Sequence, residues 1–187
     1  MGKPRAPQPV VLVCGLISGD DGFLQRARAD LKRLFGPIDL ASETWPFELT
    51  DYYSAEMGPG LLRQFVSFER LLRPDALASV KLDTQRIETR FAEDCESLEI
   101  ARPINLDPGY VETSKLVLAT TKDRSHRVYL GDGIYGESTL HYHEHAWQPW
   151  PWTFPDFRER RYHEFFSRVR QRLLDLRRAG RDTDAGA

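Results

Sequence analysis

The sequence predicts one α+β domain: a ferredoxin-like β-α-β-β-α-β unit extended by a further antiparallel hairpin and a C-terminal helix. Three observations support this prediction. The chain has 187 residues, 41% of them hydrophobic and 29% charged, which suits a single globular domain with a real core. Apolar runs of strand length alternate with segments of helical periodicity. Turn-forming residues separate them, and no long linker divides the chain.

The first part of the chain predicts two strands around a helix. Residues 9–17 form a continuous apolar run, which is typical of a buried strand. Gly36-Pro37 ends the following helix, and residues 38–45 predict a second strand. The apolar face of that helix is set three and four residues apart, at Leu24, Ala27, Leu31 and Leu34.

A long connection at residues 46–60 leads to the second half of the unit. Residues 62–72 predict a third strand, with a helix as the alternative. Pro74 suits a helix start, and residues 100–106 predict a fourth strand. Between these two strands a helix is predicted, because its mainly apolar residues recur at intervals of three and four: Leu77, Val80, Thr84, Ile87 and Phe91.

The remaining strands are expected at residues 115–121, 126–130 and 134–142, with Gly131-Asp132-Gly133 as the turn between the last two. A final helix is expected over about residues 158–178. The domain would then span residues 9–180, with flexible tails at 1–8 and 181–187.

The composition limits the class of protein. A net charge of −2 argues against a whole-surface nucleic-acid binder, although the arginine-rich last helix leaves RNA contact open. Cys14 and Cys95 are the only cysteines, so a disulfide framework is not expected and the cytoplasm is the natural compartment. The first residues lack the apolar core of a secretory signal, and no apolar run reaches the length of a membrane span. We therefore expect no membrane partner, while a homo-oligomer stays open.

Residues 105–137 place turn formers beside ionisable side chains, as functional sites at strand ends do. Asp107, Glu112 and Glu137 could together hold Mg²⁺ or Mn²⁺ through oxygen ligands. The alternative is that Asp107 shapes an Asp-Pro-Gly turn and both glutamates are solvated.

Cationic side chains lie in the same stretch, at Lys115, Lys122, His126 and Arg127. Arg127 could grip a phosphate or carboxylate through its fork, and His126 could move protons near neutral pH. Strand alternation puts these two on opposite faces, so only one would line a given pocket. The alternative is that Arg127 pairs with Glu137 across the hairpin and His126 satisfies a loop carbonyl.

The long connection carries Tyr53 and Glu56, which could close over a ligand. The alternative is a loop pinned to the core by its aromatic rings. The glycines between Gly15 and Gly22 follow a strand, but no lysine accompanies them, so a phosphate loop of the G-x-x-x-x-G-K-[ST] type is absent from the sequence.

Several motifs together resemble a prokaryotic family of uncharacterised proteins, the domain of unknown function 4416. They are Thr50-Asp51-Tyr52-Tyr53, Asn105-Leu106-Asp107-Pro108-Gly109-Tyr110, Lys122-Asp123-Arg124-Ser125-His126-Arg127 and Pro151-Trp152-Thr153-Phe154-Pro155-Asp156-Phe157. The resemblance covers nearly the whole chain and implies no established activity.

We expect a cytoplasmic protein that binds an anionic small molecule such as a nucleotide or phosphorylated metabolite, and whether it also processes this ligand stays open. If it is an enzyme, metal-assisted phosphoester or phosphoanhydride chemistry is the first expectation. The alternative is a non-catalytic interaction or oligomerisation module. The candidate residues are Asp107, His126 and Glu137 for chemistry; Tyr53, Glu56, Lys115, Lys122 and Arg127 for the ligand; and Asp107, Glu112 and Glu137 for the metal.

Overall fold

The computed structural model describes residues 2–48, 53–95 and 100–184. Within them the protein is α+β, with a nine-stranded sheet in the order β2-β4-β1-β5-β6-β8-β7, to which β3 adds at β4 and β9 at β8. Every paired strand is antiparallel to its neighbour. The strands are β1 Val10–Ser18, β2 Ile38–Ala41, β3 Trp45–Pro46, β4 Leu62–Leu72, β5 Asn105–Val111, β6 Lys115–Thr120, β7 Val128–Gly131, β8 Ile134–His143 and β9 Ala146–Pro149.

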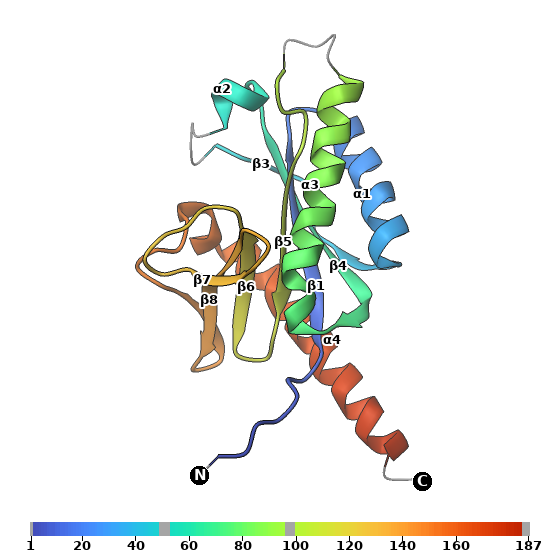
Figure 1. Ribbon diagram of the computed structural model, residues 1–187, viewed down its shortest axis with the longest axis vertical. Helices are drawn as coiled ribbons and strands as arrows, with labels where there is room; N and C mark the ends of the chain where they lie inside the picture. The colour runs from blue at the N-terminus through green and yellow to red at the C-terminus, as the bar shows by residue number, and fades with distance from the viewer. Residues whose placement is uncertain (1, 49–52, 96–99, 185–187) are drawn as a thin grey trace.

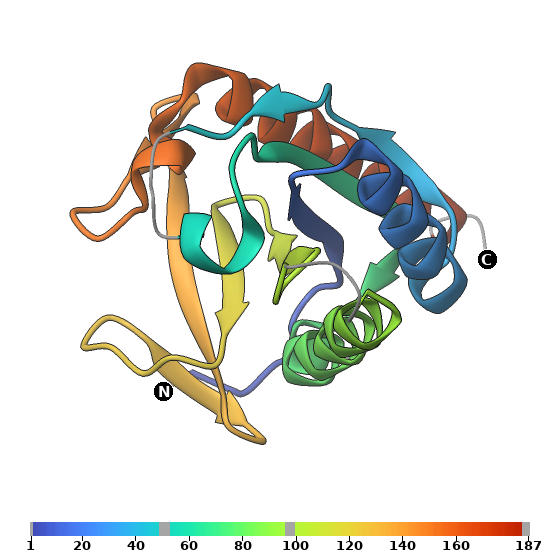
Figure 2. The same cartoon turned by 90° about the horizontal axis from the view of Figure 1, so that it is seen from above.

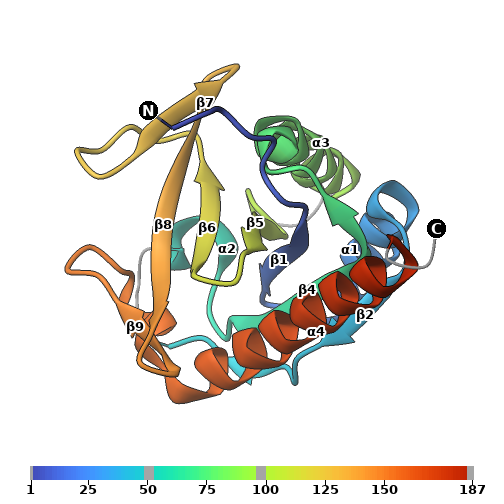
Figure 3. The same cartoon turned by 90° about the horizontal axis from the view of Figure 1, so that it is seen from below.

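Helices cover both faces of the sheet (Figures 1 and 3). Helices α1 (Asp21–Phe35) and α3 (Leu77–Asp94) lie side by side on one face, and α4 (Arg160–Asp184) crosses the other. Strand β1 lies between β4 and β5 beneath these helices, so all nine of its residues are buried. A continuous apolar strand is what a position covered on both faces requires. No helix in the described part of the chain is both long enough and apolar enough to cross a membrane.

Local signals explain where the helices begin and end. The Asp20 carboxylate accepts a hydrogen bond from the Phe23 peptide N–H at 3.1 Å and so caps α1. Gly36 ends that helix with a φ of 94°, in a region that L side chains rarely adopt. A short 3-10 turn, Pro74–Ala76, leads into α3.

An aromatic cluster joins α4 to the sheet. The ring of Phe65 on β4 lies 4.7 Å from that of Tyr162, 5.1 Å from Phe166 and 5.8 Å from both Phe157 and Phe165. Phe157 belongs to a second 3-10 turn, Pro155–Arg158, just before α4. The cluster therefore holds this turn against β4.

The structure differs from the sequence prediction at the fourth strand. β5 spans residues 105–111, so Asp107-Pro108-Gly109 lies inside a strand and is not a turn. β5 pairs with β1 from Asn105 to Val111 but with β6 only from Gly109 onward. A Cβ on Gly109 would lie 2.4 Å from the Val117 carbonyl oxygen, so only glycine allows this close approach. Pro108 has no N–H to donate, and before it β5 and β6 separate.

Smaller differences surround the long connection. The expected strand at 38–45 is divided into β2 and β3, and a short helix, α2 (Ser54–Met57), lies within the connection. Figure 2 shows α2 above the ends of β5 and β6, where these strands part. Strand β9 was not expected, and α4 continues to Asp184, beyond the expected end of the last helix.

Candidate functional site

A cavity of about 450 Å³ lies where β5 and β6 separate. Its wall combines the first half of β5, the end of β6 with the following loop, the start of β4, and the 3-10 turn before α4. Among the described residues it is lined by six cationic side chains and three carboxylates. The cations are Arg63, Lys81, Arg102, Lys122, Arg124 and Arg127, and the carboxylates are Asp107, Glu137 and Asp156.

Five of the residues expected from the sequence meet around this cavity. Tyr53, Asp107, Lys122, Arg127 and Glu137 all contribute to its lining. They come from the long connection, from β5, from the loop between β6 and β7, and from β8. The structure therefore brings together side chains that lie far apart along the chain.

Arg63 is the cation most deeply enclosed in the site. Its side chain is 1% exposed, and its Nη1 donates to Asp107 Oδ2 at 3.0 Å. The guanidinium carbon lies 4.5 Å from the centre of the Phe65 ring and 5.4 Å from that of Phe157. Within the described chain, Nε and Nη2 have no hydrogen-bond partner. Burial disfavours the charged guanidinium, but the nearby carboxylates of Asp107 and Asp156 outweigh it and raise the pKa of Arg63.

Gly15 makes room for this arginine. It lies on β1 directly between Phe65 on β4 and Asp107 on β5. A Cβ at this position would lie 2.8 Å from Arg63 Nη2 and 3.0 Å from its guanidinium carbon. The absence of a side chain thus lets Arg63 cross β1 and reach the carboxylate two strands away.

Asp107 is held on one oxygen. Arg63 and the Asn105 amide both donate to Oδ2, at 3.0 and 2.9 Å. The described residues provide no hydrogen-bond donor to Oδ1, and the side chain is 26% exposed. One carboxylate oxygen of Asp107 is therefore left for a ligand or water in the cavity.

The second carboxylate, Glu137 on β8, is only 2% exposed, and two cationic or ionisable side chains meet at its Oε2. Its Oε2 accepts a hydrogen bond from Arg127 Nε at 2.8 Å and lies 3.1 Å from His126 Nε2. Arg127 also donates from Nη1 to the Lys122 carbonyl at 2.9 Å, which ties the loop after β6 to the cavity wall. The Arg127–Glu137 pairing that the sequence left as an alternative is present.

His126 reaches the same glutamate from outside the cavity lining. Strand β7 begins only at Val128, so strict strand alternation does not apply to the His126/Arg127 pair. The His126 ring stacks on Trp152 at 5.3 Å between centroids, and Trp152 stacks on Trp150 at 5.3 Å. This ring stack ends at His141, 4.1 Å from Trp150, and it joins the loop carrying His126 to the loop before α4.

Two polar side chains of α3 form hydrogen bonds with the backbone of β5 at Leu106. Lys81 Nζ donates to the Leu106 carbonyl at 2.8 Å, and Glu88 accepts the Leu106 peptide N–H. Arg102 pairs with Glu88 at 3.4 Å and with Glu56 at 3.6 Å. Burial raises the pKa of Glu88, while the charges of Lys81 and Arg102 oppose that rise. The cationic side chains that line the cavity outnumber the lining carboxylates by three. Glu56 and Glu88 do not line it but pair with Arg102, and counting them reduces this excess to one charge.

The other expected residues lie elsewhere. Glu112 accepts hydrogen bonds from Thr113 and Ser114 in the β5–β6 turn, and it follows Asp107 by five residues, about 16 Å of extended strand. Lys115 is the first residue of β6, next to the same β5–β6 turn, and lies opposite His141 of β8 in the strand register. The proposed metal set of Asp107, Glu112 and Glu137 is thus not assembled. Within the described ranges no group of three His, Cys, Asp or Glu side chains is placed to hold a metal ion.

Sequence reasoning missed five charged lining residues: Arg63, Lys81, Arg102, Arg124 and Asp156. Two of them carried a signal. Arg63 shares its strand face with the core residue Phe65, and Lys81 interrupts the apolar stripe of its helix four residues after Leu77. Asp156 is 6% exposed, and its burial raises the pKa of its carboxyl group, opposed by the charge of Arg63.

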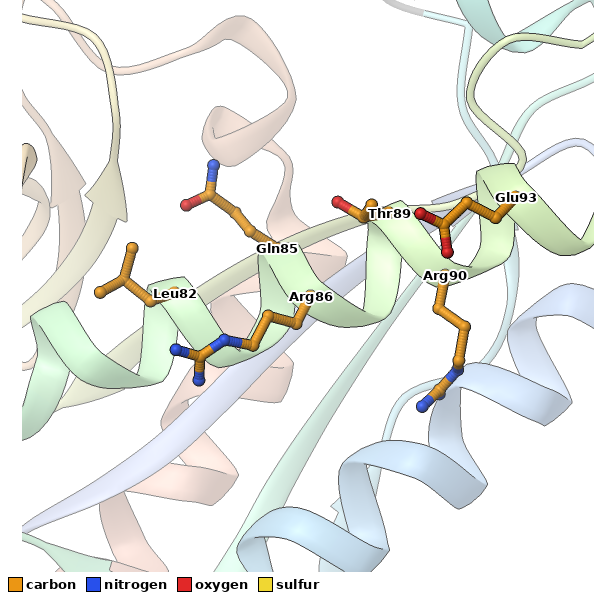
Figure 4. A pocket seen from close by; sticks show the side chains of 6 residues that line it. All are labelled: Leu82, Gln85, Arg86, Thr89, Arg90 and Glu93. Atoms are coloured by element: carbon orange, nitrogen blue, oxygen red, sulfur yellow. The ribbon is translucent and has the colours of Figure 1, made fainter.

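A second hollow, of about 380 Å³, runs along the outer side of α3 (Figure 4). Its side chains come from one helix, with Gln85 and Thr89 directed away from Arg86 and Arg90. Arg86 already pairs with Asp83, and Arg90 with Asp30. This hollow joins no residues from distant parts of the chain, so the cavity beside β5 remains the candidate site.

Comparison with known proteins places the chain in a family. Residues 8–173 match the model of a domain of unknown function, DUF4416, so the chain belongs to that family. No curated protein and no solved structure matches it significantly. The motif Thr50-Asp51-Tyr52, which contributed to the resemblance, lies outside the described residues.

Proposed function

We propose that this member of the DUF4416 family binds an anionic small molecule, of the size of a nucleotide or phosphorylated metabolite, in the cavity beside β5. The observation that carries the proposal is the convergence of six cationic side chains on a cavity of about 450 Å³, a volume typical of small-molecule sites. Cationic side chains that converge from separate elements attract phosphate and carboxylate groups.

The cavity wall also offers apolar surface. Phe47, Tyr53, Leu118, Phe154 and Phe157 line it together with the charged groups. The Tyr53 ring packs 5.9 Å from Phe47, and the Arg102 guanidinium carbon lies 5.9 Å from the Tyr53 ring centre. A ligand with a ring at one end and an anionic group at the other would use both kinds of wall.

Arg124 is the best probe of the anionic end. It lies in the exposed loop after β6, lines the cavity, and donates to the Asp123 carbonyl, so its loss disturbs no buried pair. Arg86 is a matched control, because it is also an exposed arginine but lines the hollow on α3.

The test is calorimetric titration with nucleoside monophosphates, ribose 5-phosphate and inorganic phosphate, each with and without Mg²⁺. We expect saturable binding of at least one of these anions, weakened about tenfold by Arg124→Ala and unchanged by Arg86→Ala. A gain of affinity with Mg²⁺ would support a divalent ion shared between Asp107 and the ligand. Absence of binding for the whole series, or equal weakening by both substitutions, contradicts the proposal.

A second candidate is self-association through β7. This strand is at the edge of the sheet, and its Val128, Tyr129 and Leu130 side chains are exposed. An apolar edge strand is a template for pairing with another chain. Light scattering of the wild type and of Tyr129→Lys tests this: a dimer dissociated by the lysine supports it, and a wild-type monomer at high concentration contradicts it.

We also propose that β1, α1, β2, β4, α3 and β5 form a ferredoxin-like unit. Their order along the chain, the antiparallel sheet order β2-β4-β1-β5 and the placement of both helices on one face support this assignment. A solved structure of the isolated chain is the direct test.

A further inference from the structure

We propose that Asp107 and Asp156 form an acid–base pair that hydrolyses a glycosidic bond in the anionic ligand, with Asp156 as the acid and Asp107 as the base. This inference rests on the proposed binding function and adds a reaction and a substrate class to the same cavity. It uses Asp156, a residue for which the binding proposal has no role.

The two carboxyl groups share one buried cation. Asp107 comes from β5 and Asp156 from the 3-10 turn before α4, and both line the cavity. Arg63 donates to Asp107 directly, and its charge also acts on the carboxyl group of Asp156. The incomplete hydrogen bonding of this enclosed guanidinium indicates that it serves a site.

Their surroundings differ in the way that an acid and a base require. Asp107 is 26% exposed and receives hydrogen bonds from Arg63 and Asn105 on Oδ2, while the described residues leave Oδ1 without a donor. Asp156 is buried beside Phe157, which disfavours its charge. A hydrogen-bonded, partly exposed carboxylate beside a carboxyl group buried against apolar rings is a common arrangement of the base and the acid of a hydrolase.

Glycosidic bonds suit this pair. Oδ1 of Asp107 takes a proton from a water molecule, whose oxygen forms a bond to the anomeric carbon. The bond from that carbon to the leaving group breaks, and the leaving group keeps the electron pair and receives the proton of Asp156. Water is the only co-reactant, and exchange with solvent returns each carboxyl group to its starting state.

The remaining wall fits an anionic glycoside. Arg124 and Arg127 supply positive charge for a phosphate, and the rings of Tyr53 and Phe157 can pack on a sugar or a base. A nucleoside 5′-monophosphate combines these groups with a glycosidic bond, so this class of compound is the probe.

The experiment incubates the full-length protein with AMP, GMP, CMP and UMP and measures free base and ribose 5-phosphate by chromatography, with binding measured in parallel. We expect release of at least one base, and a fall in kcat of about 100-fold or more in Asp156→Asn with a Kd within about threefold of wild type. The kcat/KM profile of the wild type should be bell-shaped, and the alkaline limb should be absent in Asp156→Asn.

Asp156→Asn carries the test because the amide has the size of the protonated acid and is also neutral, so the variant should fold, which the melting temperature checks. Asp107→Asn is the second variant, although it leaves Arg63 without its direct partner and can unfold the chain. Nucleotide binding without base release, or equal turnover by Asp156→Asn and wild type, overturns the inference and leaves the binding proposal intact. Failure to bind any of the four nucleotides, ribose 5-phosphate or inorganic phosphate removes both.

Discussion

Replacing Gly15 by alanine tests whether Arg63 needs the open space over β1. The new Cβ would lie 2.8 Å from Arg63 Nη2, 3.0 Å from the guanidinium carbon and 3.0 Å from Phe65 Cε1. The guanidinium cannot withdraw easily, because it is enclosed by aromatic rings and bonded to Asp107. Overpacking of this kind typically costs about 1–3 kcal/mol, and three close contacts place Gly15→Ala near the upper end.

Urea unfolding followed by circular dichroism measures this cost. A loss of about 2–3 kcal/mol would lower the midpoint by roughly 1 M. Gly19→Ala is the matched control, because Gly19 directly follows β1 and its nearest neighbour, the Pro59 carbonyl oxygen, would lie an ordinary 3.4 Å from the added carbon. We expect this control to stay within about 1 kcal/mol of wild type.

A double-mutant cycle identifies the cause. If the clash with Arg63 dominates, Gly15→Ala should cost at least about 1 kcal/mol less in an Arg63→Met background than in wild type. The reasoning is refuted if Gly15→Ala is no more destabilising than Gly19→Ala, or if its cost is the same with and without the arginine.

Three further substitutions have defined outcomes. Arg127→Met should destabilise the fold by about 3–5 kcal/mol in urea, because Glu137 stays buried without its main cation, and Arg127→Met/Glu137→Met should recover part of that loss. Glu112 has a pKa lowered to about 2: burial alone would raise it, but hydrogen bonds from Ser114 and Thr113 prevail. The stability it contributes is therefore present above about pH 4.5 and lost as the pH falls toward 2, so the deficit of Glu112→Gln, about 1 kcal/mol after solvent screening, should vanish in acid. Glu88 has a raised pKa, so its contribution is present below its ordinary pKa and lost as the pH rises; the unfolding free energy of wild type relative to Glu88→Gln should fall from pH 4 to pH 8, and an opposite slope would contradict the assignment.

Periodicity predicted most of the regular structure because burial follows it. The strands expected at residues 9–17 and 62–72 correspond to β1 and β4, which contain continuous buried runs, and both were located to within one residue. The error at β5 has a physical cause. Asp107-Pro108-Gly109 has the composition of a turn, yet Gly109 is needed for the close approach of β6 and Pro108 lies where the β5–β6 pairing stops.

The candidate site was predictable only in part. Composition around Asp107, Arg127 and Glu137 pointed to the part of the chain that meets at the cavity, and all three line it. The role of Gly15 could not be read from the sequence, because it depends on an arginine arriving from another strand. Glu112 was grouped with Asp107 because the two are close in sequence. In an extended strand, however, residues five positions apart lie far from each other in space.

The cavity exists only when both halves of the chain are in place. Arg63 meets Asp107 across β1, and β1 is hydrogen-bonded to both of their strands. Closing these long-range pairings is the slow, entropically costly part of assembling an antiparallel sheet. A compound that occupies the cavity would therefore recognise only the fully assembled domain and raise the melting temperature of the whole molecule, whereas fragments ending before β5 would show no such response.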